Sequence, residues 1–198
     1  VRIHAGPGMG LIAHRCGDVR IEGLRVEPSG SRVMSTNCDA THFISCSGEI
    51  RIARCVFRGM GDDAANVHGF YLTVRRIEGC RVIVSLDVAP QDFEMDLPDP
   101  GDQLELVRSD TLLPYGTGTV LQVFWDGISR QAELELSGDL TPQAAVGDLL
   151  ANRSKAARLV FEDNTAENIR GRALLVQTRH AVVRDNRFVH CTGQGVHV

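Results

Sequence analysis

Two adjacent aspartates, Asp62 and Asp63, follow a glycine-rich corner in the stretch RGMGDDAANVHG, and a third, Asp39, lies 24 residues before Asp63. Two neighbouring carboxylates repel each other when both are ionised, and this repulsion raises the pKa of one of them. Hydrolysis of a glycosidic bond uses such a pair, one acid to protonate the leaving oxygen and one carboxylate to activate water. An Asp-Asp pair alone is also typical of a solvated turn. The interpretation therefore depends on whether the fold brings Asp39 beside the pair.

The sequence repeats itself with a period in the low twenties. One family of segments combines acidic, aliphatic and arginine residues in a recurring order, at 17–26, 48–57, 157–166 and 180–189. A second family contains DATHFISC, DAANVHGF, GRALLVQT and GQGVHV. Short β-favouring runs punctuated by glycine and asparagine at this period are typical of a solenoid, in which stacked coils bury each other's apolar faces. We expect an all-β chain that forms a parallel β-helix.

The repeat is interrupted once. From about Arg81 to Asn152 the chain alternates in the manner of half-buried antiparallel strands, as in GTVLQVFWDG and QAELELSG. We therefore expect parallel β-helix coils with the acids in residues 1–80, an inserted small antiparallel β-barrel or sandwich in 81–152, and further coils in 153–198. The second family of segments predicts one parallel sheet made of residues 38–46, 63–70, 171–178 and 193–198.

Consecutive coils would bring the three aspartates together. If Asp39 and Asp63 occupy equivalent positions on neighbouring coils, their backbones lie about 5 Å apart, one strand spacing. Asp62 then adds a third carboxylate to the same patch. Such crowding of like charges is tolerated mainly where function needs acids of perturbed pKa. We interpret Asp39, Asp62 and Asp63 as an acidic catalytic centre that keeps one member protonated near neutral pH.

Composition argues against several other functions. The 198-residue chain has a formal net charge of −4, whereas nucleic-acid-binding proteins normally carry a basic stripe. No apolar run approaches the roughly 18 residues of a membrane span. Six cysteines without a CxxC pair, and histidines that do not cluster in sequence, predict no zinc site. Because the chain starts without methionine and ends within a repeat, we expect it to be part of a longer protein.

These motifs resemble a known family. NCDATHF around Asp39, GMGDDAANVHGFY around Asp62 and Asp63, an all-β insert and renewed coils are together similar to the glycoside hydrolase family 110 α-galactosidases. The resemblance implies a right-handed parallel β-helix carrying inserted β-barrel modules. It also implies release of terminal α-1,3-linked galactose, including from blood group B type glycans, with inversion and without a cofactor or metal. Asp39, Asp62 and Asp63 carry over as the catalytic acids.

Roles within this centre follow from glycosidase chemistry. We assign Asp62 as the general acid, while Asp39 and Asp63 hold and deprotonate the attacking water. In inverting enzymes the acid and the base lie roughly 6.5–9.5 Å apart, and we expect that separation here.

Neighbouring polar residues are candidates for binding substrate hydroxyls, namely His42, Asn66, His68 and Asn37. Their alternative is an ordinary exposed ladder, or for Asn37 a hydrogen bond to the turn backbone. Asn164 and Asn186, which lie 22 residues apart, are instead expected to form a structural ladder inside the coil.

Three other functions compete with this interpretation. A polygalacturonase-type glycosidase also uses one Asp and a later Asp pair, and Arg58, Arg75 or Arg76 could bind its uronate, but this sequence lacks the NTD and RIK motifs. A β-helix polysaccharide lyase often needs calcium, which three aspartates could bind. A non-catalytic carbohydrate-binding or adhesin-like solenoid would use the acids only as surface charge.

The expected partner is a carbohydrate in each of these interpretations. Glycans of this kind meet bacterial enzymes outside the cytoplasm, so the substrate predicts an extracellular or periplasmic location. A homodimer is the assembly that the sequence leaves open.

Overall fold

A computed structural model describes residues 1–85, 96–137 and 144–198, and it is an all-β structure. The chain divides into two compact units. Val1–Gly69 and Lys155–Val198 form one, here called the parallel unit, and Phe70–Ser154 form the other, here called the barrel unit. Among the described residues, no helix has the length and apolar character needed to cross a membrane.

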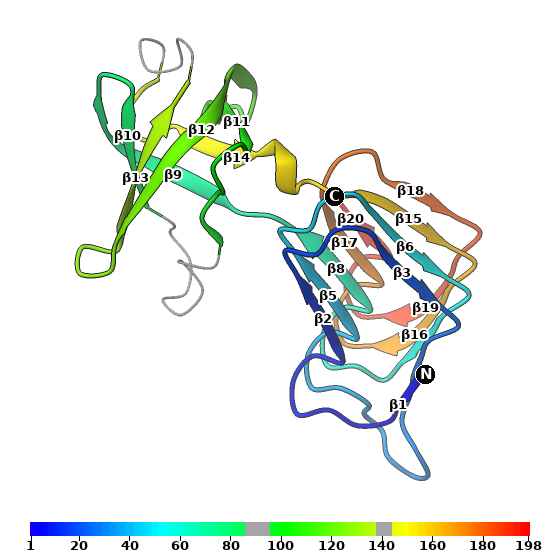
Figure 1. Ribbon diagram of the computed structural model, residues 1–198. Coiled ribbons are helices and arrows are strands. Elements are labelled where there is room, and N and C mark those ends of the chain that lie inside the picture. The colour runs from blue at the N-terminus through cyan, green and yellow to red at the C-terminus, as the bar shows by residue number, and fades with distance from the viewer. Residues whose placement is uncertain (86–95, 138–143) are drawn as a thin grey trace. The chain divides into compact units, whose positions relative to one another are not determined.

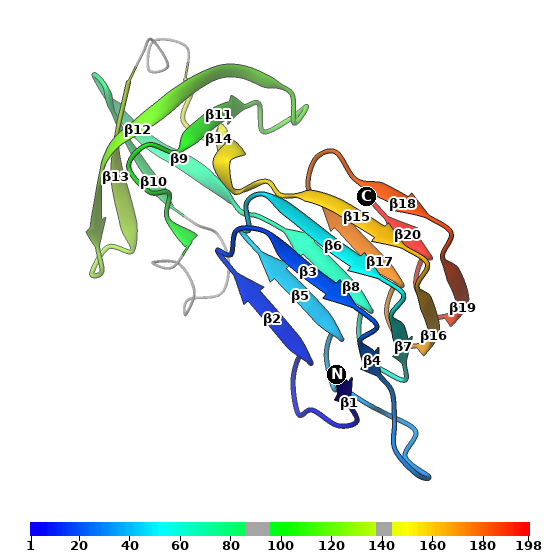
Figure 2. The same ribbon diagram turned by 45° about the vertical axis from the view of Figure 1, so that its right-hand side comes forward.

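The parallel unit contains three parallel sheets, and successive strands enter them in rotation (Figures 1 and 2). The first sheet is ordered β2 (Leu11–His14), β5 (Thr41–Ile44), β8 (Ala65–His68), β17 (Leu174–Gln177) and β20 (Val196–His197). The second contains β3 (Val19–Glu22), β6 (Glu49–Ala53), β15 (Arg158–Glu162) and β18 (Val182–Arg184). The third contains β1 (Arg2–Ile3), β4 (Arg25–Val26), β7 (Val56–Arg58), β16 (Thr165–Ile169) and β19 (Arg187–Cys191).

This topology confirms the prediction of an all-β chain with parallel sheets, and it is compatible with a parallel β-helix. The four segments predicted to share one sheet do so, because β5 pairs in parallel with β8, β8 with β17, and β17 with β20.

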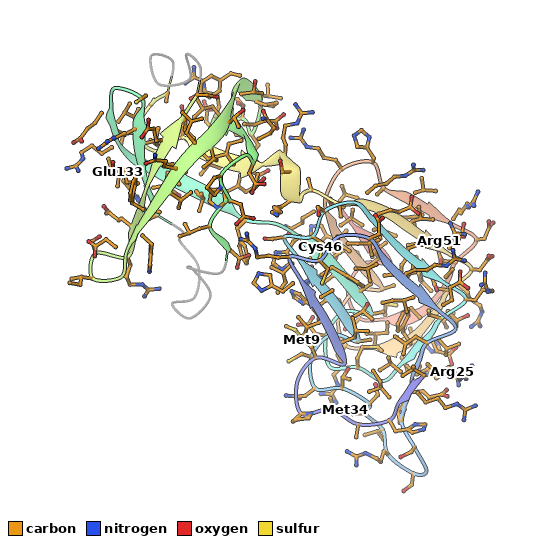
Figure 3. All side chains as sticks on the ribbon, viewed as in Figure 1. Met9, Arg25, Met34, Cys46, Arg51 and Glu133 are labelled. Carbon is orange, nitrogen blue, oxygen red and sulfur yellow. The ribbon has the colours of Figure 1, made fainter. Side chains whose placement is uncertain are left out.

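Apolar side chains fill the interior of the parallel unit, and charged side chains lie on its surface (Figure 3). Phe57 and Phe161 are fully buried and stack with their ring centroids 6.4 Å apart, and Phe188 continues the column 6.3 Å from Phe161. Charged side chains such as Arg25 and Arg51 lie on the outside of the unit (Figure 3).

One corner recurs with the same backbone conformation on successive passes of the chain. The residue between the second and third sheets has a positive φ each time, at Gly23, Arg54, Asp163 and Asp185. A residue in the left-handed conformation turns the chain sharply from one sheet into the next. Because the same turn recurs on each pass, the passes stay in register.

An asparagine follows this corner on two passes of the chain. Asn164 accepts a hydrogen bond of 2.8 Å from the Cys55 backbone N–H through its Oδ1. Its own backbone N–H donates to Asn186 Oδ1 at 2.9 Å. The predicted structural ladder of Asn164 and Asn186 is therefore present, and it satisfies backbone groups that the turn leaves without strand partners.

The barrel unit is a closed antiparallel barrel ordered β10-β13-β12-β11-β14-β9. Its strands are β9 (Tyr71–Glu78), β10 (Arg81–Ser85), β11 (Gln103–Val107), β12 (Pro114–Asp126), β13 (Gln131–Leu136) and β14 (Leu149–Asn152). Leucine and valine side chains, including Leu104, Leu106 and Leu134, fill its core. The 3-10 turn Arg153–Lys155 follows the last strand.

The start of this unit corrects the predicted boundary at 80/81. Strand β9 pairs antiparallel with β10 and β14, so the barrel begins at Phe70. The misplaced boundary has a physical cause, because Gly79 has a positive φ and forms the hairpin turn between β9 and β10. The predicted boundary therefore falls just after a hairpin turn within the barrel.

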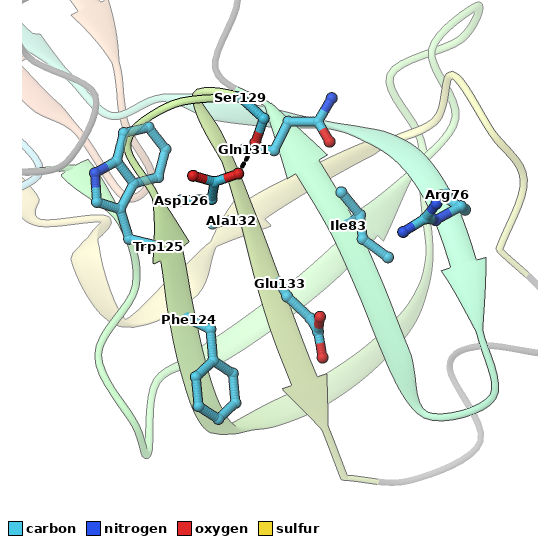
Figure 4. A pocket seen from close by; sticks show the side chains of 9 residues that line it. All are labelled: Arg76, Ile83, Phe124, Trp125, Asp126, Ser129, Gln131, Ala132 and Glu133. Atoms are coloured by element: carbon cyan, nitrogen blue, oxygen red, sulfur yellow. Dashed lines mark hydrogen bonds between the residues drawn. The ribbon is translucent and has the colours of Figure 1, made fainter.

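The barrel carries a shallow pocket of about 210 Å³ on its surface (Figure 4). A row of residues in register crosses four strands beneath it, namely Phe124, Glu133, Ile83 and Arg76. Glu133 pairs with Arg81 at 2.9 Å, and Asp126 accepts a 2.6 Å hydrogen bond from the Ser129 hydroxyl. Glu133 is thus paired with a positive charge, whereas the Asp126 carboxylate is stabilised by a hydrogen bond.

Candidate active site

The three aspartates lie at corners that precede strands β5 and β8. Asp39 and Asp63 each stand two residues before the paired positions Thr41 and Ala65, so they are equivalent on neighbouring passes of the chain. The Ala40 N–H donates to the Asp63 carbonyl oxygen at 2.9 Å, which continues the parallel hydrogen-bond pattern up to the acids. The 24-residue spacing therefore corresponds to one pass of the chain.

Glycine allows the corners of successive passes to approach closely. A Cβ atom on Gly171 would lie 2.6 Å from the carbonyl carbon of Asp62 and 2.7 Å from Asp63 Oδ1. A Cβ atom on Gly61 would lie 2.3 Å from the carbonyl oxygen of Asn37. Since real side chains do not tolerate such contacts, glycine at these positions is a condition for packing the acidic corners together.

The carboxylates of Asp39, Asp62 and Asp63 form one cluster. One oxygen from each lies within 4.8 Å of the others, with Asp39 and Asp63 buried and Asp62 exposed. This spacing is shorter than the roughly 6.5–9.5 Å expected between acid and base in inverting enzymes. The cluster is tighter because stacked parallel strands set the corners about one strand spacing apart.

Asp63 is bound on both oxygens by Arg172. Its Oδ1 accepts from the Arg172 backbone N–H at 2.7 Å and from Nε at 2.9 Å, and its Oδ2 accepts from Nη2 at 2.8 Å. These bonds raise the pKa of Arg172. With Asp63 fully buried, the bidentate guanidinium compensates a charge that would be costly alone.

Arg172 was not predicted as a site residue, although a signal for it exists. The segments DATHF, DAANV and RALLV align in register, with Arg172 in the position of Asp39 and Asp63. The barrel insert separates Arg172 from Asp63 by 109 residues. GRALLVQT belongs to the same family of repeated segments, but it has an arginine where the other two have an aspartate, so a search for carboxylates passes over it.

Asp39 has a different set of partners. Its Oδ1 accepts the Asp63 backbone N–H at 3.0 Å, and its Oδ2 lies 2.5 Å from His42 Nδ1. The Asn66 amide donates to the same Oδ2 at 3.5 Å. Among the described residues, Asn66 Oδ1 is buried without a hydrogen-bond partner. Leaving such an acceptor unpaired costs stability, as is common where a site is built for function.

Asp62 holds a proton more readily than an ordinary aspartate. Although its side chain reaches solvent, the surrounding protein desolvates the carboxyl group, and this is the main cause that raises its pKa. The neighbouring charges of Asp39 and Asp63 raise it further, while Arg172 opposes them. These are the properties expected of a general acid.

The candidate substrate-binding residues differ in their relation to the acids. His42 and Asn66 face each other across β5 and β8 and both contact Asp39. His68 contacts His42, with the two Nε2 atoms 2.8 Å apart. Asn37 is exposed at the corner, and its backbone N–H donates to the Gly6 carbonyl oxygen at 3.0 Å. Three of the four thus form a connected group with Asp39.

Three carboxylates this close could also hold a cation. The donors are largely engaged within the protein, however, because Asp63 binds Arg172 on both oxygens and Asp39 binds His42 and a backbone N–H. A guanidinium ion against one carboxylate supplies the positive charge that a metal would otherwise bring. The donor set therefore fits proton transfer better than metal binding.

No family model matches the sequence. Among curated proteins, the chain is 31% identical over 208 residues to alpha-1,3-galactosidase B of Bacteroides fragilis, covering 99% of this chain and 35% of that protein. It is 29% identical over 199 residues to alpha-1,3-galactosidase B of Akkermansia muciniphila, covering 99% and 25%. It is 32% identical over 201 residues to alpha-1,3-galactosidase A of Shewanella woodyi, covering 95% and 31%.

These similarities confirm that the chain resembles the α-1,3-galactosidases over nearly its whole length. The chain spans about a third, or less, of the length of these relatives.

Proposed function

We propose that this chain carries the catalytic centre of a glycoside hydrolase that removes terminal α-1,3-linked galactose from glycans, on a right-handed parallel β-helix. The observation that carries the proposal is the aspartate cluster, in which two buried carboxylates crowd an exposed third one, Asp62, whose pKa is raised by desolvation and by these two neighbours. The names of the similar proteins support the sugar and the linkage. A glycan substrate in turn suggests an extracellular or periplasmic location.

In the proposed reaction Asp62 is the general acid. Its proton passes to the glycosidic oxygen as the bond from that oxygen to the anomeric carbon breaks. Asp39 and Asp63 orient a water molecule, whose oxygen bonds to the anomeric carbon while one of its protons passes to a carboxylate. Arg172 acts as a positioning residue because it fixes the buried Asp63 carboxylate through a bidentate contact.

Substrate recognition is proposed at the same wall. Asn66 and His68 are two residues apart on β8, so they lie on the same face of the sheet as His42. One ligand could therefore contact the polar groups of all three. Asn37 is exposed at the acidic corner and could contact a hydroxyl from that side. A sugar ring has several hydroxyls, and hydrogen bonds that strengthen in the transition state would favour galactose.

The stereochemical outcome is the finer part of the proposal. We propose inversion, so the first-formed product is β-galactose. One oxygen from each aspartate lies within 4.8 Å of the others, which is closer than the usual inverting separation, so product stereochemistry is a demanding test. NMR spectra recorded at early reaction times distinguish the anomers. α-Galactose as the first product would instead indicate a covalent intermediate and retention.

The polygalacturonase alternative is not favoured by the arrangement of its candidate uronate ligands. Arg58 forms ion pairs with Glu167 and Glu27, and Arg76 pairs with Glu78 at 2.9 Å. Arginines neutralised in this way offer little attraction to a uronate carboxylate.

Activity on three substrates tests the proposed function. The protein is incubated with p-nitrophenyl α-galactoside, α-1,3-galactobiose and polygalacturonate, each with and without a chelator. We expect release of galactose from the first two, unaffected by the chelator. Cleavage of polygalacturonate alone would support the polygalacturonase or lyase alternative, with chelator sensitivity pointing to the lyase. Absence of cleavage throughout would favour a carbohydrate-binding module.

A further inference from the structure

A chain of hydrogen bonds leads from Asp39 away from the acidic cluster. His42 Nδ1 lies 2.5 Å from Asp39 Oδ2, and His42 Nε2 lies 2.8 Å from His68 Nε2. His68 Nδ1 lies 3.1 Å from the carbonyl oxygen of Gly69. The two rings meet edge-on at 88°, which lets an N–H of one ring point at the nitrogen lone pair of the other. His42 is buried, whereas His68 is half-exposed.

The strand register explains why the two histidines touch. His42 pairs with Asn66, and Ile44 pairs with His68, so the histidines are diagonal neighbours on one face of β5 and β8. Diagonal neighbours remain within reach of long or aromatic side chains. Their separation of 26 residues, two more than that of the stacked positions, reflects this offset.

The three contacts determine how many protons the chain holds when each contact contains a hydrogen. The Gly69 carbonyl oxygen can only accept, so His68 Nδ1 carries a hydrogen. A second hydrogen lies between the two Nε2 atoms, and a third lies between His42 and Asp39. Two neutral imidazoles supply only two hydrogens. The complete set therefore holds one additional proton, either on a histidine beside an ionised Asp39 or on Asp39 itself.

We propose that Asp39, His42 and His68 form a proton relay in which Asp39 takes the proton of the attacking water and His68 releases it to solvent. The inference rests on the proposed function and assigns the base within it. Before Asp39 takes the proton from water, the relay holds two hydrogens for three contacts, so one contact lacks a hydrogen. After the step, all three contacts are filled.

The reaction balances with this relay. One water O–H bond breaks, its oxygen bonds to the anomeric carbon, and its proton enters the relay at Asp39. The glycosidic bond breaks, and the leaving oxygen takes the proton of Asp62. His68 then releases one proton to solvent while Asp62 regains one, so that each turnover consumes one water molecule. Within the relay His42 and His68 are positioning residues, because they act on the proton transfer through Asp39.

Asp63 is less suited to the role of base. Both of its oxygens are occupied by Arg172, and no buried histidine contacts it among the described residues. Asp39, by contrast, leads to the surface through two groups that can each carry a proton.

The other charged or titratable groups around the relay are few. Opposite Ile44 on β2 lies His14, a diagonal neighbour of His42, while on β17 the residues facing Asn66 and His68 are Leu175 and Gln177. Asp62, Asp63 and Arg172 stand at the strand starts beside Asp39. His14 provides a matched control, because it lies on the same face while Asp39 and His68 engage the two ring nitrogens of His42.

Nitrogen-15 NMR of histidine-labelled protein tests the relay without substrate. We expect hydrogen on Nδ1 of both His42 and His68, and ring-nitrogen signals of the two residues that move together during a pH titration. In Asp39→Asn the joint titration should shift for both, whereas in His14→Gln it should not. Independent titration of His42 and His68 in the unsubstituted protein would overturn the relay, whatever the activity. Joint titration in a protein that cleaves no galactoside would leave the relay standing and reject the proposed function.

Kinetics separate a relay from a structural role. His68→Gln keeps a hydrogen-bonding side chain that cannot carry a proton, so kcat/KM should fall by about 10- to 100-fold, towards the lower end of what acid–base catalysis supplies. The ascending limb of the plot of kcat/KM against pH for His68→Gln should also move to lower pH. The reason is that the relay can no longer store the additional proton. His14→Gln should change neither. An equal loss at every pH, with the limb unmoved, would show that His68 only supports the fold and would refute the relay.

Discussion

Asp62 in the parallel unit and Asp148 in the barrel unit show that burial alone does not decide how an aspartate behaves. Asp148 is only 6% exposed, and it accepts hydrogen bonds from the Tyr115 hydroxyl at 2.5 Å and from Arg108 Nη1 at 3.1 Å. Burial by itself would raise its pKa, but bonds from Tyr115, the Ser109 N–H and Arg108 lower it overall. Asp62 is exposed, yet its pKa is raised.

The difference lies in the partners that each carboxylate has. Among the described residues, Arg108, Tyr115 and the Ser109 N–H donate to Asp148, and Arg108 also lies over the Tyr115 ring at 3.8 Å. Desolvation and the bond to Asp148 raise the pKa of Tyr115 to about 12, so its hydroxyl remains a donor. Around Asp62 two of the neighbours are carboxylates. A satisfied carboxylate stabilises a fold, whereas a crowded one is held ready to exchange a proton.

The largest expected effect is on catalysis. Asp62→Asn should lower kcat/KM on α-1,3-galactobiose by about 10²- to 10⁴-fold, the range that acid–base catalysis supplies. On p-nitrophenyl α-galactoside the loss should be smaller, because that leaving group needs little protonation. Asp39→Asn should be impaired about equally on both substrates.

Asp148→Asn is the matched control for this experiment, and it should retain near-normal rates in steady-state assays below its unfolding temperature. Rescue of Asp39→Asn but not of Asp62→Asn on the activated substrate would exchange the two roles. Near-normal rates for both Asp39→Asn and Asp62→Asn would show that the acids of the parallel unit are no more catalytic than Asp148 of the barrel unit.

The second prediction concerns the buried ion pair of Asp63 and Arg172. Arg172→Gln leaves the Asp63 carboxylate buried without its counter-charge, so the free energy of unfolding should fall by about 3–5 kcal/mol. Chemical denaturation at neutral pH measures the change. Arg76→Gln, which removes an exposed partner of Glu78, should cost no more than about 1 kcal/mol. Adding Asp63→Asn to Arg172→Gln should recover part of the loss. Equal costs for the two arginine variants would contradict the buried pair.

The third prediction concerns the stability that Asp148 provides. Because its folded pKa lies below the unfolded value of about 3.9, its contribution is complete above that value and disappears as pH falls through the folded pKa. Asp148→Asn should therefore destabilise the protein by about 1–3 kcal/mol at neutral pH. Thermal unfolding across the acid range should show this difference shrinking as pH falls. A difference that stays constant with pH would mean that the lost charge is not its cause.

The smallest expected effect is a gain in stability on replacing Asp62, opposite in sign to the loss expected for Asp148→Asn. Since the folded pKa of Asp62 lies above its unfolded value, ionised Asp62 destabilises the fold at neutral pH, and this cost appears as pH rises through the two pKa values. Asp62→Asn should slightly raise Tm at neutral pH and leave it unchanged in acid. A lower Tm at neutral pH would place Asp62 with the satisfied carboxylates and weaken its assignment as the acid.

Local pattern and period account for what the sequence alone predicts. The spacing of Asp39 and Asp63 equals one pass of the chain, so their stacking follows from the repeat itself. The sheet that contains β5, β8, β17 and β20 follows in the same way, as does the ladder of Asn164 and Asn186. Each of these features needs only that neighbouring passes lie in register.

The tertiary structure decides the partners of the acids. Arg172 reaches Asp63 across a separation of 109 residues, and the diagonal contact of His42 and His68 is two residues out of step with the repeat. The barrel begins at Phe70 rather than at Arg81 because strand pairing, not the point at which the repeat is lost, defines where a sheet begins. Desolvation and ion pairing sum over neighbours from distant parts of the chain, so a sequence pattern can locate carboxylates but cannot reveal which one holds the proton.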